Sequence, residues 1–349
     1  MKVLVVGASG NVGTSVVGAL SRAPEVEQIL GLARRLPSLE LPKLRWARAD
    51  ITTDDLVPHF RGADAVVHLA WAIQPGHDEA TLERINVGGS ARVFDAVAAA
   101  GVPSLVHASS VGAYSPGPKN RPVDESWPTD GIPTSTYSRH KAAVERLLDT
   151  FEAAQPGTRV VRLRPGLIFK AEAASEIRRL FLGPFFPRFL ANPRLIPLVP
   201  RTPRLRFQAV HSDDVGDAYR RAVLGAASGA FNVAAEPPIG PSELARLLGA
   251  RPVPVPARVL RTAASLTWRA HLQPAGPGWI DLALGAPLMD TARAREELGW
   301  NPAASSLEAL TDLLRGLREG RGAATPPLDP RAGGRARLGE LATGVGERQ

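Results

Sequence analysis

Three glycines near the N-terminus limit the fold of this chain more than any other feature. They belong to the segment Gly7-Ala8-Ser9-Gly10-Asn11-Val12-Gly13, which follows an apolar run and opens a stretch of helical periodicity. Gly7 permits a tight turn, Gly10 lets backbone amides approach a pyrophosphate at the helix N-terminus, and Gly13 lets helix and strand pack closely. The spacing GxxGxxG has one more loop residue than GxGxxG. This context predicts a Rossmann-type domain that binds a dinucleotide through the three glycines, Ser9, Asn11 and Val12.

Short apolar strands alternate with helical stretches through the first half of the chain. This alternation is typical of a parallel sheet with helices on both faces. We predict strands at Lys2 to Val6, Gln28 to Leu32, Leu44 to Ala49, Ala65 to Leu69, Ser104 to Ala108 and Arg159 to Leu163. We predict helices at Asn11 to Arg22, Thr53 to Arg61, Glu79 to Ala100 and Ser135 to Ala154. The expected fold class is α/β, a doubly wound parallel sheet with a smaller C-terminal substrate-binding region.

The pattern changes after Pro165. Prolines interrupt the stretch from Gly183 to Pro203, where we expect regular structure to stop. It resumes near Val210, where Ser212 or Asp213 is expected to cap a helix. We therefore predict a nucleotide-binding core formed by residues 1–165, with residues 207–235 returning to it. Residues 166–206 and 236–319 would form the substrate-binding region, which ends in a helix. The tail, residues 320–349, is rich in Gly, Pro, Arg and Ala and is expected to be disordered.

Composition excludes several classes of function. The chain has no cysteine and its seven histidines form no pair with ligand spacing, so we expect no disulfide, thiolate nucleophile or metal site. No apolar run approaches the roughly 18 residues of a membrane span, and residues 1–7 lack the features of a signal peptide, so we expect a cytoplasmic protein. The net charge of +8 comes from arginines spread along the chain. We interpret them as solvated surface, with a basic rim near a phosphate-bearing ligand as the alternative, and expect no nucleic-acid partner.

The end of the second predicted strand bears on the choice of dinucleotide. The segment Gly31-Leu32-Ala33-Arg34-Arg35 has alanine where an NAD site usually places a carboxylate for the ribose 2′-hydroxyl. Arg34 and Arg35 can contact a 2′-phosphate, which predicts NADP(H) as the preferred cofactor and NAD(H) as the alternative. The alternative is that Arg34 and Arg35 merely face solvent. Asp50 and Ile51, after the third strand, are expected to contact the adenine, although Asp50 also suits a turn or a helix cap.

A tyrosine and a lysine four residues apart carry the candidate chemistry. Tyr137 and Lys141 lie in a helical stretch, so both side chains share one face. A nearby ammonium is expected to lower the pKa of the Tyr137 phenol, which could then exchange a proton with a substrate oxygen while hydride moves at carbon. Ser109 and Ser110 follow the fifth strand, at the edge where α/β folds bind ligands. By itself, a YxxxK pattern also fits a solvated helix face.

These motifs occur in the order and spacing of a known family. They are the glycine loop, Asp50-Ile51, His68-Leu69-Ala70, Asn86-Val87, Ser109-Ser110 with Tyr114, Tyr137 to Lys141, Arg164-Pro165-Gly166, His211 to Val215, and Asp290 with Leu298-Gly299-Trp300 and Pro302. From Lys2 to Glu319 the chain thereby resembles the extended short-chain dehydrogenase/reductase family, in its NAD-dependent epimerase/dehydratase group.

The resemblance implies roles for individual residues. Tyr137 would be the general acid/base, and Lys141 would hold the nicotinamide ribose hydroxyls and lower the pKa of Tyr137. Ser110, rather than Ser109, matches the catalytic Ser/Thr of the family. The backbone at Leu69, Ala70 and Pro165 would lie along the cofactor, whereas for Asn86 a purely structural tie between a helix start and the sheet is the alternative. Relatives often dimerise through the helices that correspond to Glu79 to Ala100 and Ser135 to Ala154, so a homodimer is expected.

Two departures from the family pattern bear on the substrate. Trp71 replaces a small residue after His68-Leu69-Ala70, which would narrow or reshape the substrate side, and Ala33 departs from epimerases that retain NAD through an acidic residue. Residues 178–189 combine arginine and phenylalanine, which fits a lid over an apolar carbonyl or alcohol, or else a loop in the core of the small region. Arg204 and Arg206 would instead suit the diphosphate of a nucleotide sugar.

Three functions remain open from the sequence. The first is an NADP(H)-dependent oxidoreductase acting on a ketone or a secondary alcohol, with the cofactor exchanged at each turnover. The second is a nucleotide-sugar epimerase or dehydratase with a retained cofactor. The third is a non-catalytic NADP-binding sensor or scaffold, which the presence of Ser110, Tyr137 and Lys141 argues against.

Overall fold

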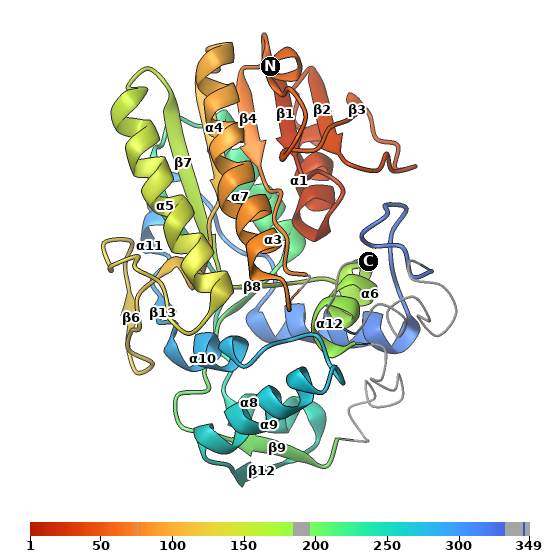
Figure 1. Ribbon diagram of the computed structural model, residues 1–349, viewed down its shortest axis with the longest axis vertical. Helices are drawn as coiled ribbons and strands as arrows, with labels where there is room; N and C mark the ends of the chain where they lie inside the picture. Colours follow the sequence, from red (N-terminus) through yellow and green to blue (C-terminus); the bar gives the residue numbers. More distant parts are fainter. Residues whose placement is uncertain (75, 184–195, 332–344, 346–349) are drawn as a thin grey trace.

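A seven-stranded parallel sheet forms the centre of the computed structural model, which describes residues 1–74, 76–183, 196–331 and 345 (Figure 1). The strand order is β11-β7-β5-β4-β1-β2-β3, and all six pairings are parallel. The strands are β1 (Lys2–Val6), β2 (Gln28–Ala33), β3 (Leu44–Arg48), β4 (Ala65–His68), β5 (Ser104–Ala108), β7 (Arg159–Pro165) and β11 (Gly229–Val233). The predicted α/β Rossmann-type fold is confirmed.

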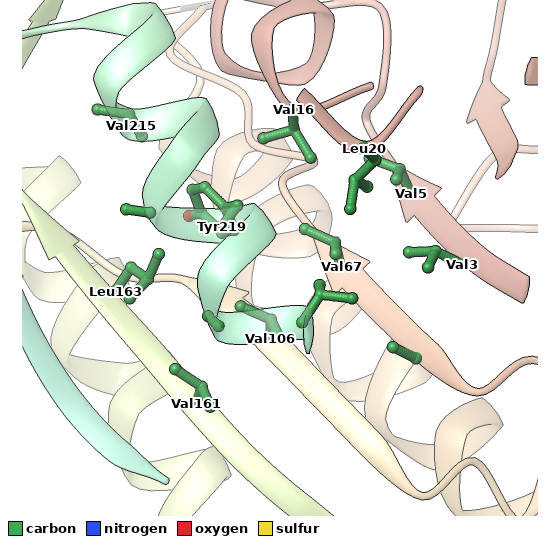
Figure 2. Packing of buried hydrophobic residues seen from close by; sticks show 14 of the residues in the cluster. Val3, Val5, Val16, Leu20, Val67, Val106, Val161, Leu163, Val215 and Tyr219 are labelled. Atoms are coloured by element: carbon green, nitrogen blue, oxygen red, sulfur yellow. The ribbon is translucent and has the colours of Figure 1, made fainter. Parts of the chain in front are cut away.

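Helices cover both faces of this sheet and bury two apolar clusters. On one face, α1 (Asn11–Arg22) packs beside α7 (Ser212–Leu224), and Figure 2 shows Val16 and Leu20 of α1 and Val215 and Tyr219 of α7 over the sheet valines. On the other face lie α2 (Val57–Phe60), α4 (Gly89–Ala100) and α5 (Thr136–Ala154). Valine and leucine fill both clusters because parallel strands are buried on both sides.

The topology changes direction between β1 and β4. From β1 the chain moves outward to β2 and β3, and then returns to β4 and continues to β5, β7 and β11 on the other side. Ligands bind α/β sheets at such a switch point, outside the carboxyl ends of the strands. Here that edge carries the glycine loop after β1 and the Leu69-Ala70 segment after β4, whose amide at Leu69 donates to the Val6 carbonyl (2.8 Å).

The remaining elements gather below the carboxyl edge of the sheet (Figure 1). Three small parallel pairs are formed by β8 (Leu167–Phe169) with β10 (Ala209–His211), β9 (Leu198–Arg201) with β12 (Arg251–Pro254), and β6 (Pro122–Val123) with β13 (Leu288–Met289). The helices are α6 (Ala174–Ile177), α8 (Pro241–Leu248), α9 (Ala257–Arg269), α10 (Gly278–Gly285), α11 (Ala292–Glu297) and α12 (Ser306–Glu319), with short turns η2 (Val111–Ala113), η3 (Ala171–Ala173) and η4 (Arg178–Leu182). None of the described helices is long and apolar enough to cross a membrane.

Several predicted boundaries were wrong. The helix expected at Thr53 to Arg61 is only α2, because Asp50 and Asp55 side chains bind nearby amides and hold a turn instead. The helix expected at Glu79 to Ala100 is α3 (Glu79–Glu83), a π turn η1 (Arg84–Gly88) and α4 in succession. The cap of α7 is His211, whose Nδ1 accepts from the Asp213 amide (3.3 Å), rather than Ser212 or Asp213.

Two stretches predicted to be irregular are partly ordered. Of Gly183 to Pro203, residues 184–195 lie outside the described part, but β9 follows and pairs with β12, a distant partner that local sequence does not reveal. Residues 320–331 of the tail that we predict to be disordered make defined contacts in the structure. There Leu328 is fully buried, and the Ser175 hydroxyl and the Arg179 guanidinium bind the carbonyls of Arg321 and Pro327. Apart from Val345, the rest of the tail lies outside the described residues.

Candidate active site

The glycine loop brings the first turn of α1 against the switch point. Gly7 has a φ of +84°, and a Cβ built there would lie 2.6 Å from the Ala70 nitrogen, so only glycine lets the two loops approach this closely. At Gly13 a Cβ would lie 2.4 Å from the Gly7 carbonyl oxygen. Gly10 caps α1 without a side-chain hydrogen bond, so its first amides are not capped by the residue before them. Backbone amides at a helix N-terminus suit a phosphate group.

A carboxyl group also lies at this helix N-terminus. Glu176 of α6 accepts a hydrogen bond from the Asn11 backbone amide. Burial raises the pKa of Glu176 to about 7, against the opposing charges of Arg179 and Lys170. Lys170 itself donates to the Asn11 carbonyl (2.8 Å) and the Thr14 hydroxyl (2.6 Å), which ties the segment after β8 to α1. Glu176 therefore shares the amides that a dinucleotide pyrophosphate would use.

The residues predicted at the adenosine end occupy two different settings. Arg34 and Arg35 follow β2 and are exposed, with no side-chain hydrogen bond among the described residues. Asp50 holds a turn, since its Oδ1 accepts from the amide and the hydroxyl of Thr52 (2.9 and 2.7 Å). Ile51 is buried, and its carbonyl accepts from Arg92 (2.9 Å). The arginines are thus accessible to a ligand. Asp50 instead makes the hydrogen bonds of a turn, which was the alternative to the adenine contact expected from the sequence.

The segment after β4 is fixed by Asn86. The Asn86 side chain is buried, donates to the Ala72 carbonyl (2.8 Å) and accepts from the Ala72 amide (2.7 Å). This pair of bonds holds the backbone that carries Leu69, Ala70 and Trp71 along the site. Asn86 lies in the π turn η1, which places its side chain toward the sheet edge.

Ser110 and Tyr137 lie together beneath η2. Ser110 caps η2, and its hydroxyl oxygen accepts from the Gly112 amide (3.0 Å), so its proton remains available to another acceptor. A Cβ built at Gly112 would lie 2.7 Å from the Tyr137 ring and 3.4 Å from the Ser110 hydroxyl, which shows how closely the three residues pack. Burial raises the pKa of Tyr137 to about 12, against the opposing effect of a hydrogen bond with Ser110. The phenol is therefore protonated at neutral pH.

Lys141 lies one turn further along α5, but it does not lower the pKa of Tyr137 as expected from the sequence. Its Nζ donates to the Ala108 carbonyl (2.7 Å) and lies 3.5 Å from the centre of the Trp71 ring and 5.8 Å from that of Tyr137. Burial lowers the pKa of Lys141 to about 7, while the charge of Glu145 opposes this shift. Desolvation of both groups thus outweighs the attraction of the ammonium for a phenolate.

Glu145, Arg162 and Arg164 form a buried ion cluster next to the site. Glu145 is 1% exposed and accepts from Arg164 at both carboxylate oxygens (2.9 and 3.0 Å) and from Arg162 (2.9 Å). Burial alone would raise the pKa of Glu145, but Arg164 and Arg162 lower it to about 2. The Ser109 hydroxyl donates to the same carboxylate. Ser109 therefore points to this cluster, and Ser110 is the serine that faces Tyr137.

Aromatic rings surround the Tyr137 phenol. Trp71 meets its ring edge-on with 5.8 Å between centroids, and Trp279 of α10 lies at 4.9 Å. Phe181 of η4 contacts Trp279 at 4.8 Å, while the other half of the predicted lid, residues 184–189, lies outside the described part. The Trp71 indole nitrogen is buried and has no hydrogen-bond partner within the described part of the chain. The surroundings of the Tyr137 ring are therefore largely aromatic.

The arginines suggested for a diphosphate are partly engaged elsewhere. Arg204 donates to the carbonyls of Leu284 (3.1 Å) and Gly117 (2.7 Å), and Arg206 donates to that of Lys119 (3.1 Å). Pro165 ends β7 opposite Val233 and is buried. No group of three or more acidic or histidine side chains in the described part of the chain is placed to hold a metal ion.

Comparison with known proteins defines the family. Residues 3–234 match the model of the NAD dependent epimerase/dehydratase family. The chain belongs to this family. The matched range includes the glycine loop, Ser110, Tyr137 and Lys141, and it ends with β11, the last strand of the central sheet. Members of this family are enzymes, and the resemblance inferred from the sequence is confirmed.

Sequence relatives extend beyond the family match. An uncharacterised protein of Mycobacterium tuberculosis is 28% identical over 91% of this chain, but the chain spans only 30% of that protein's length. A second uncharacterised protein of the same species is 27% identical over 94% of this chain and 86% of its own. A UDP-glucose 4-epimerase of Streptomyces lividans is 32% identical over 61% of this chain and 64% of its own.

Solved structures of the family share the fold. A UDP-glucose 4-epimerase from Thermus thermophilus, in complex with NAD, has a TM-score of 0.66 and 23% identity, over 91% of this chain and 99% of that one. A dTDP-glucose 4,6-dehydratase from Streptomyces venezuelae, with NAD bound, has a TM-score of 0.68 and 21% identity, over 94% and 100% of the two chains. At these identities the likeness concerns the fold.

The structure adds residues that the sequence did not single out. Glu145 repeats the spacing of Tyr137 and Lys141 by another four residues, so helical periodicity offered a signal for it. Glu176 and Trp279 come from the C-terminal half, and only the folded chain brings them to the sheet edge. No local pattern indicates such long-range neighbours.

Proposed function

We propose that this chain is an NADP(H)-preferring oxidoreductase that transfers hydride at a ketone or secondary alcohol carbon. The observation that carries the proposal is the convergence of Ser110, Tyr137 and Lys141 at the carboxyl edge of the sheet, the edge that also carries the glycine loop. The residues present fit a dinucleotide, because the glycines bring the start of α1 to the edge of the sheet, where backbone amides suit a pyrophosphate, and because Arg34 and Arg35 are exposed and can contact a 2′-phosphate. The bound nicotinamide would supply or accept the hydride.

The chain itself would handle the proton. Since the pKa of Tyr137 is about 12, its hydroxyl holds a proton at neutral pH and can donate it to a carbonyl oxygen as negative charge develops there. The Ser110 hydroxyl, which is hydrogen-bonded with Tyr137, could turn its proton to the same oxygen when substrate is bound. Lys141, in its protonated form, would stabilise the tyrosinate that remains. The Trp71 and Trp279 rings beside Tyr137 would exclude water and favour a substrate that is apolar around its reacting carbon.

A nucleotide-sugar epimerase or dehydratase is the second candidate. It is favoured by the relatives whose names describe UDP-glucose and dTDP-glucose enzymes. Two observations count against it: Ala33 replaces the acidic residue that would retain NAD, and Arg204 and Arg206 already bind backbone carbonyls. Nicotinamide that stays with the protein through purification would support this candidate, whereas empty protein that binds added NADPH would support the oxidoreductase.

Turnover in a Tyr137→Phe variant tests the proposal. With wild-type protein we expect NADPH oxidation with members of a panel of ketones and none with nucleotide-diphosphate sugars. Removing the phenolic proton should slow that turnover roughly 100- to 10,000-fold, while NADPH affinity stays within about threefold because the ring remains in place. Turnover of Tyr137→Phe at the wild-type rate would contradict the assigned role of Tyr137. NADPH binding without turnover of any compound would favour the sensor alternative.

A further inference from the structure

Exposed apolar side chains gather at one end of the molecule. Seven large hydrophobic residues of the described chain are exposed, and five of them belong to β9, β12, α9 and the turn after α9. Figure 1 places these elements, which together with α8 we call the distal lobe, at the end away from the N-terminus and the edge strand β3. The five residues are Leu198 (56% exposed), Val253 (37%), Val259 (50%), Leu266 (61%) and Leu272 (51%).

Helix α9 shows an apolar stripe to the outside. Val259, Ala263, Leu266 and Ala270 follow the spacing i, i+4, i+7 and i+11, so they lie along one face, and all four are exposed. The opposite face holds the helix in place, because Arg261 pairs with Asp281 of α10 (2.9 Å) and the Trp268 ring stacks on His77 at 4.2 Å. None of the residues of α9 is buried. An anchored helix with its apolar stripe outward has the form of a docking element.

The charge around this stripe has a single sign. Residues 244–280 contain no aspartate or glutamate, and neither do residues 196–206. The first of these ranges contributes Arg246, Arg251, Arg258, Arg261 and Arg269. Arg258 and Arg269 flank the stripe on the same side of the helix, both are exposed, and neither has an acidic partner among the described residues. The distal lobe thus offers apolar and cationic groups and no exposed carboxylate of its own in these two ranges.

Exposed apolar side chains next to exposed arginines indicate which kind of partner this surface would bind. A second copy of the same face would place arginines against arginines, so like charges oppose self-association here. An anionic lipid surface offers negative headgroups to the arginines and an apolar layer beneath them to the stripe. We propose that the distal lobe is a peripheral membrane-binding surface that docks on anionic phospholipids, with Val259 and Leu266 entering the interface. Because the attraction between the arginines and the headgroups is electrostatic, the contact is reversible and weakens at high salt.

Co-sedimentation of the full chain with vesicles tests this proposal independently of its catalytic function. Wild-type protein should sediment with vesicles of equal parts phosphatidylcholine and phosphatidylglycerol, remain in solution with phosphatidylcholine alone, and be released by high salt. A Val259→Asp/Leu266→Asp double variant should bind at least about tenfold less, since it adds two negative charges to the stripe. Leu36→Asp is the control for an aspartate outside the distal lobe: Leu36 is 55% exposed but follows β2, and this variant should bind like the wild type.

Three outcomes would overturn the proposal. The first is wild-type protein that stays in solution with the anionic vesicles, and the second is equal binding of the double variant and the Leu36→Asp control. The third is a wild-type dimer in light scattering that the double variant converts to a monomer, which would assign the surface to self-association. Thermal unfolding of both variants, expected within a few degrees of the wild type because the changed side chains are exposed, shows that each is folded.

Discussion

At the scale of residues, burial controls the candidate site more than pairing does. The sequence places Tyr137 and Lys141 on one helix face and leads to the expectation that the ammonium lowers the pKa of the phenol. In the folded chain both groups are buried, and burial favours their neutral forms. It raises the pKa of Tyr137 to about 12 and lowers that of Lys141 to about 7. Identity and spacing were therefore predictable from the sequence, whereas the pKa values depend on Trp71 and other neighbours that only the fold supplies.

The role of Glu176 at the phosphate site can be tested by cofactor binding alone, without a substrate. Its carboxyl lies at the start of α1, and its pKa is raised to about 7 by burial. Above that pH the carboxylate repels a pyrophosphate, and below it the protonated group does not, so wild-type affinity for NADPH should rise as the pH falls from 8 to 6. Glu176→Gln should bind NADPH roughly fivefold more tightly at pH 8, or about 1 kcal/mol, and its affinity should vary less with pH. Calorimetric titrations at both pH values would measure this. An unchanged pH dependence in the variant would exclude a role for Glu176 at the phosphate site.

At the scale of elements, strands and long helices were predicted well because their periodic patterns are local. The six strands expected in the first half are all present, with ends shifted by at most two residues. The failures have physical causes that lie in side chains and distant partners. Asx turns at Asp50 and Asp55 shorten α2, and β9 exists because β12 pairs with it.

The glycine loop is the element on which the cofactor site depends most. In Gly13→Ala, the new Cβ would lie 2.4 Å from the Gly7 carbonyl oxygen, so α1 must move away from the loop. We expect a loss of about 1–3 kcal/mol in the free energy of unfolding and NADPH binding weakened at least about tenfold.

Gly18→Ala in the same helix is the control, because its Cβ meets only Arg22 at 3.7 Å and alanine favours helix by up to about 1 kcal/mol. Urea unfolding and NADPH titration of the two variants measure these effects. Equal behaviour of the two would mean that close packing at Gly13 is unimportant.

At the scale of the whole molecule, long-range contacts determine the structure of a segment that composition alone describes poorly. The tail after Glu319 has the composition of a disordered segment, yet residues 320–331 contact α6, η4 and the loop after β2, where the Ser38 hydroxyl donates to the Ala324 carbonyl (3.3 Å). Polar bonds and one leucine hold this segment, and a composition rule does not detect such sparse contacts. The segment lies beside Arg179 and the loop that carries Arg34 and Arg35, at the adenosine end of the candidate site.

Leu328 tests whether this segment is part of the folded molecule. Its side chain is fully buried, so Leu328→Ala should lower the free energy of unfolding by about 2 kcal/mol or more. Leu36→Ala, at an exposed leucine, should change it by less than about 0.5 kcal/mol. Chemical denaturation of the two variants gives both values. A Leu328→Ala protein as stable as the wild type would restore the prediction of disorder for residues 320–331.

The most direct test of the account is a calorimetric titration of NADPH and NADH into the wild-type protein and into Arg34→Asp. The central claim is that the glycine loop and the exposed arginines after β2 hold an NADP(H) molecule against Ser110, Tyr137 and Lys141. We predict that wild-type protein binds NADPH at least about tenfold more tightly than NADH, and that Arg34→Asp loses or reverses this preference. Equal affinity of the wild type for both cofactors, or an unchanged preference in Arg34→Asp, would contradict the claim.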